Sequence, residues 1–236
     1  MTSTAKEKII VALDAPNLDS ALRLADALED AISWVKIGLQ LFAAEGPSIV
    51  SAMKERQLKV FLDLKFHDIP NTAHEAVRSA VRLGADMTTI HLSGGTSMVR
   101  SAIEAAADSQ LLVLGVTVLT SMDETQLREI GVLRTPEQQV IELVTLGHGC
   151  GLRGVVCSPL EIRPLRNRFG DSLTIVTPGV RPSGAMLDDQ KRVMTPADAV
   201  RAGATYLVIG RPIAAAKSPR EAATRIVDEI ARGLSE

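Results

Sequence analysis

The sequence alternates from end to end between short runs of β-forming residues and longer stretches with helical periodicity. The expected strands are Ile9–Asp14, Trp34–Ile37, Val60–Lys65, Met87–Leu92, Leu112–Val118, Gly154–Cys157, Thr174–Thr177 and Tyr206–Ile209. Strand–helix repeats of this kind indicate parallel strands joined by crossover helices. Eight repeats in 236 residues predict a (β/α)8 TIM barrel, with residues 1–236 as a single domain. A doubly wound open sheet is the alternative, but it usually has fewer strands.

The segment 17–31 illustrates the helical pattern between the strands. Its apolar residues recur at helical spacing, and they are Leu18, Ala21, Leu22, Ala25 and Leu28. Either Asn17 or Asp19 is placed to cap the start of this helix.

Composition narrows the class of protein. The net charge is −2, and there is one Trp and one Tyr, so the cationic face and stacking aromatics of a sequence-independent nucleic-acid binder are missing. No apolar run approaches the roughly 20 residues of a membrane helix, and the first ten residues lack a secretory core. Two cysteines, Cys150 and Cys157, have the spacing of neither a redox pair nor a zinc site. We expect a cytoplasmic protein with no membrane or nucleic-acid partner.

Charged residues stand near the carboxyl ends of the first three expected strands. Because alternate residues of a strand share a face, Asp63 and Lys65 lie opposite the aliphatic side of their strand. The same alternation places Asp14 and Lys36 opposite the aliphatic sides of theirs. If the aliphatic sides meet the helices, the four charges converge at the carboxyl-terminal mouth of the barrel, where barrel active sites lie. His91, at the end of the fourth strand, is a candidate to join them.

The last two strands are followed by a second candidate site. "TPGVRP" (177–182) and "IGRPI" (209–213) each place an arginine shortly after a glycine. Gly179 and Gly210 would let backbone N–H groups approach an anion, and Arg181 and Arg211 could add bidentate hydrogen bonds. Because barrels often bind phosphate between these two loops, the pair predicts a phosphorylated substrate. The stretch 178–196 is the longest irregular segment, and loops of this length inside a compact domain are usually functional or disordered.

Six stretches carry a family resemblance that spans nearly the whole chain. They are "VALDAP", "VKIGLQLF", "VFLDLKFHDIPNT", "GVTVLTSM", "TPGVRP" and "VIGRPI", in this order. With them the chain resembles the bacterial type of orotidine 5′-phosphate decarboxylase. The resemblance implies conversion of orotidine 5′-phosphate to UMP and carbon dioxide, the last step of de novo UMP biosynthesis, without metal or cofactor.

The resemblance also implies the roles of the charged residues. Lys36, Asp63, Lys65 and Asp68 would form an alternating array, in which Lys65 gives a proton to pyrimidine C6. Asp63 would lie against the departing carboxylate, and Lys36 would bond Asp63.

The remaining roles concern the nucleotide and the assembly. The resemblance assigns ribose hydroxyls to Asp14 and Lys36, the nucleotide to Thr120 and Ser121, and the phosphate to Arg211 with the backbone near Gly210. Arg181 and Gln190 would close over the phosphate from the long loop. Asp68 and Thr72 would reach into the site of a neighbouring subunit, which implies a homodimer.

Two other functions stay open at this point. One is a metal-dependent sugar-phosphate decarboxylase or aldolase of the same barrel group. Such enzymes share the DxKxxD motif, here Asp63, Lys65 and Asp68, but place an acid where this chain has Lys36, because magnesium prefers oxygen ligands. The other is a non-catalytic barrel that binds UMP. Four mutually tuned charges argue against binding alone.

Overall fold

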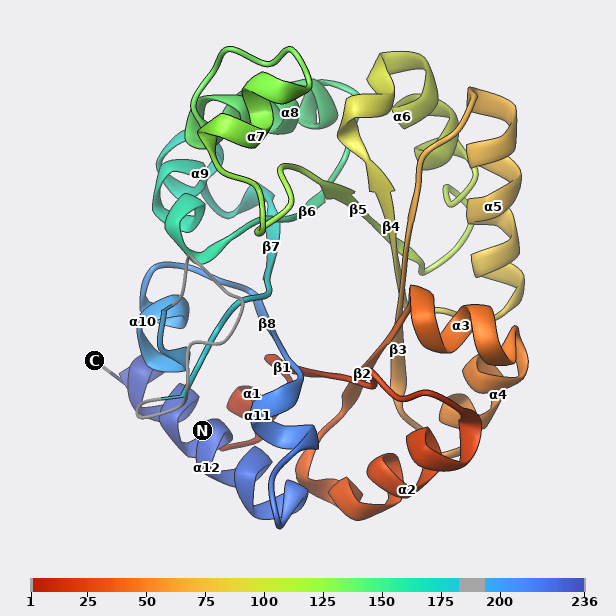
Figure 1. The fold of residues 1–236 in the computed structure, drawn as a ribbon, viewed down its shortest axis with the longest axis vertical. Coiled ribbons are helices and arrows are strands. Elements are labelled where there is room, and N and C mark those ends of the chain that lie inside the picture. The colour runs from red at the N-terminus through yellow and green to blue at the C-terminus, as the bar shows by residue number, and fades with distance from the viewer. Residues whose placement is uncertain (1, 183–193, 236) are drawn as a thin grey trace.

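The computed structural model describes residues 2–182 and 194–235, and its centre is a closed barrel of parallel strands (Figure 1). The strands are β1 (Ile9–Ala12), β2 (Trp34–Gly38), β3 (Lys59–Phe66), β4 (Met87–His91), β5 (Leu112–Val116), β6 (Gly154–Val156), β7 (Thr174–Thr177) and β8 (Tyr206–Ile209). They follow one another in chain order, and β8 pairs with β1 to close the barrel. The predicted (β/α)8 barrel is confirmed.

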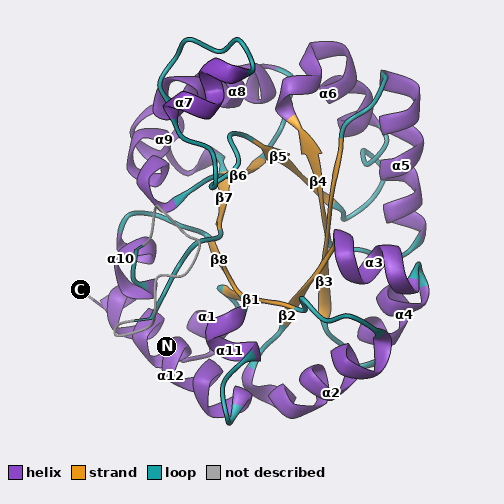
Figure 2. Cartoon of the chain, in the orientation of Figure 1, coloured by secondary structure: helices purple, strands orange, loops and turns teal. Residues whose placement is uncertain are grey.

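Helices form an outer ring around the strands (Figure 2). They are α1 (Thr2–Lys6), α2 (Leu18–Leu28), α3 (Leu39–Glu45), α4 (Ser48–Glu55), α5 (Pro70–Arg82), α6 (Gly95–Glu104), α7 (Glu124–Glu129), α8 (Pro136–Gly149), α9 (Ile162–Phe169), α10 (Pro196–Arg201), α11 (Arg211–Ala214) and α12 (Pro219–Ser235). None of the helices in the described ranges combines the length and the apolarity needed to cross a bilayer.

Helix α2 shows how the sequence pattern becomes packing. Its Ala21, Ala25 and Leu28 are buried, as the helical spacing predicted. Of the two residues considered for its cap, Asn17 takes the role, because its Oδ1 accepts the Ser20 N–H at 3.0 Å. This bond satisfies one of the N–H groups that a helix start leaves without a partner.

Several strand ends differ from the sequence prediction. β1 stops at Ala12, so Asp14 lies in the following loop rather than in the strand. One further ladder bond forms, from Leu13 N–H to Lys36 O at 2.9 Å, but Pro16 has no N–H and the chain turns away. β4, β5 and β6 likewise end one or two residues early, whereas β2 and β3 run slightly longer.

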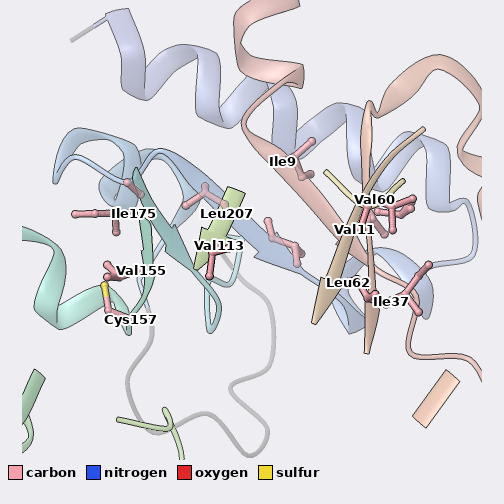
Figure 3. Packing of buried hydrophobic residues seen from close by; sticks show 14 of the residues in the cluster. Ile9, Val11, Ile37, Val60, Leu62, Val113, Val155, Cys157, Ile175 and Leu207 are labelled. Carbon is pink, nitrogen blue, oxygen red and sulfur yellow. The ribbon is translucent and has the colours of Figure 1, made fainter. Parts of the chain in front are cut away.

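The barrel wall separates two apolar layers. Outward-facing aliphatic residues of the strands pack against the helices (Figure 3), and they include Ile9, Val11, Ile37, Val60 and Leu62. The inward-facing residues form their own cluster: Ile10, Ala12, Trp34, Phe61, Met87, Leu114, Val176 and Val208. This division confirms the face assignment made from alternation in the first three strands.

The inner cluster fills the barrel below its mouth. Trp34 from β2 meets Tyr206 from β8 edge-on, with ring centroids 5.4 Å apart. The interior is therefore a packed apolar floor, and any polar group above it has little water beneath.

Candidate active site

Two lysines and an aspartate form a continuous chain of ion pairs at the carboxyl ends of β2 and β3. Lys65 Nζ lies 2.8 Å from Asp63 Oδ1, and Lys36 Nζ lies 3.5 Å from Asp63 Oδ2. The side chains of Asp63 and Lys36 are only 11% and 13% exposed, and that of Lys65 is 30% exposed. The sequence prediction that these three charges converge is confirmed.

Asp14 extends the chain toward the solvent. Its Oδ1 lies 3.6 Å from Lys36 Nζ, but its side chain is 61% exposed. Two glycines border this end of the chain: a Cβ on Gly38 would stand 3.0 Å from Lys36 Nζ, and one on Gly210 would stand 3.3 Å from Asp14 Oδ2. A side chain at either position would crowd the charged groups, so glycine leaves them room.

The backbone at Lys65 departs from the simple strand that alternation assumes. Lys65 has a φ of 51°, a left-handed conformation that non-glycine residues rarely adopt. The pairing of β3 with β4 also shifts: Leu62 pairs with Thr88, but the next pair is Phe66 with Ile90. The β-bulge turns the backbone at Lys65 so that its side chain reaches Asp63, and the regular strand that the sequence prediction assumed at Lys65 is wrong.

Electrostatics keeps Asp63 ionised despite its burial. Burial by itself raises the pKa of the Asp63 carboxyl, because it disfavours the charged form. The charges of Lys36 and Lys65, with hydrogen bonds from Lys65 and Thr89, outweigh that effect and hold the pKa below its ordinary value. The carboxylate is therefore negative at neutral pH.

A cavity of about 230 Å³ opens directly over this charged group. Lys36, Asp63 and Lys65 form its polar side, and Thr120 from the loop after β5 lines it as well. The rest of the wall is mostly apolar: Phe61, Val116, Val118, Leu119, Val156, Cys157, Pro178 and Val208. A small planar ligand with one charged or polar edge fits such a pocket. Ser121, the neighbour of Thr120, is exposed beside it.

His91 ends β4 on the same side of the barrel. Its ring lies 5.2 Å from the ring of His67, measured between centroids. Burial lowers the pKa of His91, and the charges of His67 and Lys65 lower it further, against a smaller effect of Asp63. His91 is therefore neutral at physiological pH.

The residues expected to bind phosphate occupy two different environments. Gly210 directly precedes α11, and Arg211, the first residue of α11, is exposed. Arg181 is buried, and its Nη1 donates to Val180 O at 3.1 Å. The base of the long loop is closed by the backbone bond from Arg181 N–H to Met194 O. Gln190 lies outside the described residues.

Asp68 and Thr72 stand apart from the ion-pair chain. Both are exposed, and Asp68 Oδ1 accepts the N–H of Ile69 at 2.7 Å. Within one chain, the structure therefore brings together Asp14, Lys36, Asp63 and Lys65 but not Asp68.

Thr89 was missed by the sequence prediction. It is fully buried, and its hydroxyl contacts both Asp63 and Lys65. Face alternation would have found it, because a polar residue two positions before His91 on β4 must face the barrel interior. Among the described residues, no group of three His, Cys, Asp or Glu side chains is arranged to hold a metal ion.

Comparison with known proteins gives consistent matches along the chain. The family described as "Orotidine 5′-phosphate decarboxylase / HUMPS family" matches residues 7–226. Orotidine 5′-phosphate decarboxylase of Moorella thermoacetica is 50% identical over 234 residues, covering 96% of this chain and 93% of that protein. The enzyme of the same name from Opitutus terrae is 49% identical, covering 94% of this chain and 97% of that protein. The crystal structure of orotidine 5′-phosphate decarboxylase from Lactobacillus acidophilus matches with a TM-score of 0.85 at 34% identity, covering 95% of this chain and 99% of that one.

Proposed function

The chain belongs to the orotidine 5′-phosphate decarboxylase / HUMPS family, and we propose that it converts orotidine 5′-phosphate to UMP with Lys65 as the proton donor. Decarboxylation itself follows from the family and from curated relatives that match almost end to end at about half identity. The chain is thus a carboxy-lyase of pyrimidine biosynthesis. The roles of individual residues are the part that we propose.

The ion-pair chain Lys36–Asp63–Lys65 along one side of the cavity is the observation that carries the proposal. Loss of carbon dioxide from C6 leaves an electron pair in the plane of the ring, where resonance cannot spread it. A fixed ammonium beside C6 stabilises that charge as it forms and then supplies the proton. Lys65 is suited to both tasks, because Asp63 holds its ammonium at 2.8 Å above an apolar floor.

Asp63 would face the departing carboxylate of the substrate. It stays ionised next to Lys36 and Lys65, so a second carboxylate brought against it is repelled until carbon dioxide leaves. Lys36 has two functions in this proposal: it neutralises Asp63 on one side and, with Asp14, binds the ribose hydroxyls on the other.

The rest of the nucleotide would lie across the barrel mouth. Thr120 and Ser121 would meet the base and sugar, in line with the position of Thr120 in the cavity wall. Arg211 and the backbone near Gly210 would hold the phosphate, on the same side of the mouth as Asp14. Arg181 and Gln190 would act from the long loop, and the binding energy of the phosphate would order the site.

We also propose a homodimer in which Asp68 and Thr72 complete the site of the partner. Both residues are exposed in the single chain, and the side chain between them in sequence, Ile69, is 67% exposed. A large apolar side chain in that position is suited to burial in an interface. A cytoplasmic location stays a prediction, which cell fractionation would test.

Replacing Lys65 tests the central role. Lys65→Ala should abolish the loss of orotate absorbance when the purified protein meets orotidine 5′-phosphate, while binding of UMP remains measurable. Lys59→Ala is the matched control, because Lys59 begins the same strand at the opposite end of the barrel and pairs with Glu7 at 3.3 Å. Near-normal turnover by Lys65→Ala would remove Lys65 from the proposed role.

The same assay separates the other functions that the sequence left open. Turnover should survive a chelator, because the Lys36 ammonium already stands between the carboxylates of Asp14 and Asp63. A magnesium requirement would favour the metal-dependent sugar-phosphate class, and UMP binding without turnover would favour a binding barrel.

Mixing two inactive variants tests the dimer. After Lys65→Ala and Asp68→Ala subunits are dissociated and reassociated together, mixed dimers hold one intact site, so about a quarter of all sites should regain activity. Activity that stays absent after mixing would contradict a site shared between subunits.

A further inference from the structure

The strand that carries Lys65 is held by a side chain of the next strand. β3 and β4 are neighbours in the barrel (Figure 1), and between the pairs Leu62–Thr88 and Phe66–Ile90 β3 advances four residues while β4 advances two. The two extra residues form the bulge, and within it the Lys65 backbone is left-handed, with a φ of 51°. A β-bulge disrupts the ladder locally, so polar groups within it need other partners.

Thr89 provides the partner for Lys65. The Lys65 N–H donates to Thr89 Oγ1 at 2.8 Å, in a place that is only partly open to solvent. Backbone N–H groups are rarely left without a partner when buried, so this bond favours the bulged backbone over a regular strand. Thr89 thus helps to hold the backbone conformation that sets the direction of the Lys65 side chain.

The same hydroxyl also fixes Asp63. Thr89 Oγ1 donates to Asp63 Oδ1 at 3.0 Å, and that oxygen also accepts from Lys65 Nζ at 2.8 Å. A hydroxyl has a single proton to donate, and here it is directed to the carboxylate while a lone pair accepts the Lys65 N–H. One buried side chain therefore ties the backbone of Lys65 to the carboxylate that holds the Lys65 ammonium.

Two features of Thr89 make this connection stiff. The residue is 0% exposed, so neither water nor movement of the surface competes for its hydroxyl. Its side chain is β-branched, which restricts the rotation that would carry the hydroxyl away.

We propose that Thr89 is a positioning residue for the decarboxylation, because its hydroxyl sets where Asp63 and the Lys65 ammonium stand relative to the substrate. This inference rests on the proposed role of Lys65. Thr89 itself lies behind the charged groups and acts through them.

Three variants on β4 test the inference. Thr89→Val keeps the shape and removes the hydroxyl, and Thr89→Ser keeps the hydroxyl and removes the methyl. Thr88→Val is the matched control, because Thr88 is equally buried on the same strand but donates to Leu62 O at 2.9 Å instead of to a charged group. Each variant is assayed for kcat and KM with orotidine 5′-phosphate and for the Kd of UMP, with unfolding in urea as a check on the fold.

The expected pattern is a loss in kcat alone. Displacement of a reacting group by the order of 1 Å costs about 100-fold, so Thr89→Val should lower kcat by roughly 10- to 100-fold. Its Kd for UMP should stay within about threefold of the unmodified protein, since the proposed ribose and phosphate contacts lie elsewhere. Thr89→Ser should restore most of kcat, and Thr88→Val should leave kcat unchanged even if it unfolds at lower urea.

Other outcomes overturn the inference. Unchanged kcat in Thr89→Val, or an equal loss in Thr88→Val, would reduce Thr89 to a structural residue. If Thr89→Val does not fold, Thr89→Ala is assayed instead. A wild-type kcat in Thr89→Ala would likewise contradict a positioning role for Thr89. Lys65→Ala, assayed in parallel, distinguishes the two proposals. Turnover that survives in Lys65→Ala overturns the role of Lys65. If Lys65→Ala is inactive but Thr89→Val keeps full activity, only the role of Thr89 is overturned.

Discussion

Adding one methyl group at Gly38 should damage the site without damaging the fold. Gly38 ends β2, has an extended backbone that alanine adopts readily, and lies beside Lys36 Nζ. The new Cβ would stand 3.0 Å from that nitrogen and 3.8 Å from Asp14 Oδ1. A carbon and an ammonium nitrogen need several tenths of an ångström more, so the flexible end of Lys36 must move.

The size of the effect follows from the ion-pair distances. Lys36 Nζ lies 3.5 Å from Asp63 and 3.6 Å from Asp14. With an effective dielectric constant of about 20, lengthening one such pair by about 0.5 Å costs roughly 0.6 kcal/mol, and solvent around the exposed Asp14 reduces its share. Replacing glycine by alanine at an unstrained position raises the free energy of unfolding by about 0.4–1 kcal/mol, because alanine lowers the conformational entropy of the unfolded chain. The free energy of unfolding should therefore change by less than about 0.5 kcal/mol.

Activity should respond much more than stability. Because Lys36 is proposed to hold both Asp63 and the ribose, a shift of this size should lower kcat/KM by about tenfold. Urea unfolding and the orotate absorbance assay measure the two quantities on the same preparation. Gly149→Ala is the control, since Gly149 ends α8 with open space around its added Cβ. Wild-type kcat/KM in Gly38→Ala would refute the reasoning, as would a loss of stability above about 2 kcal/mol.

Three further variants can be compared with the unmodified protein. Asp63→Asn leaves the ammonium groups of Lys36 and Lys65 without their shared carboxylate, so unfolding at neutral pH should become easier by about 3 kcal/mol. The pKa of Asp63 is lowered in the folded state, so its carboxylate stabilises the fold fully at pH values above the ordinary pKa of 3.8. This stabilisation is lost as the pH falls through the folded pKa, so the difference in unfolding free energy between Asp63→Asn and the unmodified protein should narrow at low pH. His91, whose folded pKa lies below 6.5, should take up its proton in NMR titrations at a lower pH than it does in the unfolded chain. His91→Asn should therefore flatten the fall in Tm as the pH drops from about 6.5. Thr135→Ala removes the cap of α8, which accepts Gln138 N–H at 3.3 Å, and should cost about 1 kcal/mol of unfolding free energy with kcat unchanged.

Periodicity was sufficient to predict the barrel and the side of the wall that the regular parts of β1, β2 and β3 present to the helices and to the interior. Val60 and Leu62 pack against the helices and Phe61 faces the interior, as predicted, because alternation of side chains is a property of any extended chain. The meeting of Lys36 with Asp63 followed from the same rule, since parallel neighbours in a barrel end at the same mouth.

The features that could not be predicted from the sequence depend on local backbone geometry and on partners from other parts of the chain. The left-handed turn at Lys65 could not be predicted, because that conformation is disfavoured for lysine and is held by the Thr89 hydroxyl from another strand. Likewise, the end of β1 before Asp14 reflects where its ladder to β2 runs out, which is decided between strands rather than within one. The choice of Asn17 over Asp19 as the cap of α2 needed the observed bond to Ser20.

The aromatic pair at the barrel floor gives this protein a built-in optical reporter. Trp34 and Tyr206 are the only tryptophan and the only tyrosine in the chain, and they come from β2 and β8, which flank β1 on either side. Their rings stand 5.4 Å apart, so light absorbed by the tyrosine should pass efficiently to the tryptophan once β8 has docked against β1. Because the two residues are 172 positions apart in the sequence, the fluorescence of Trp34 under tyrosine excitation would time the closure of the barrel during refolding, without any label.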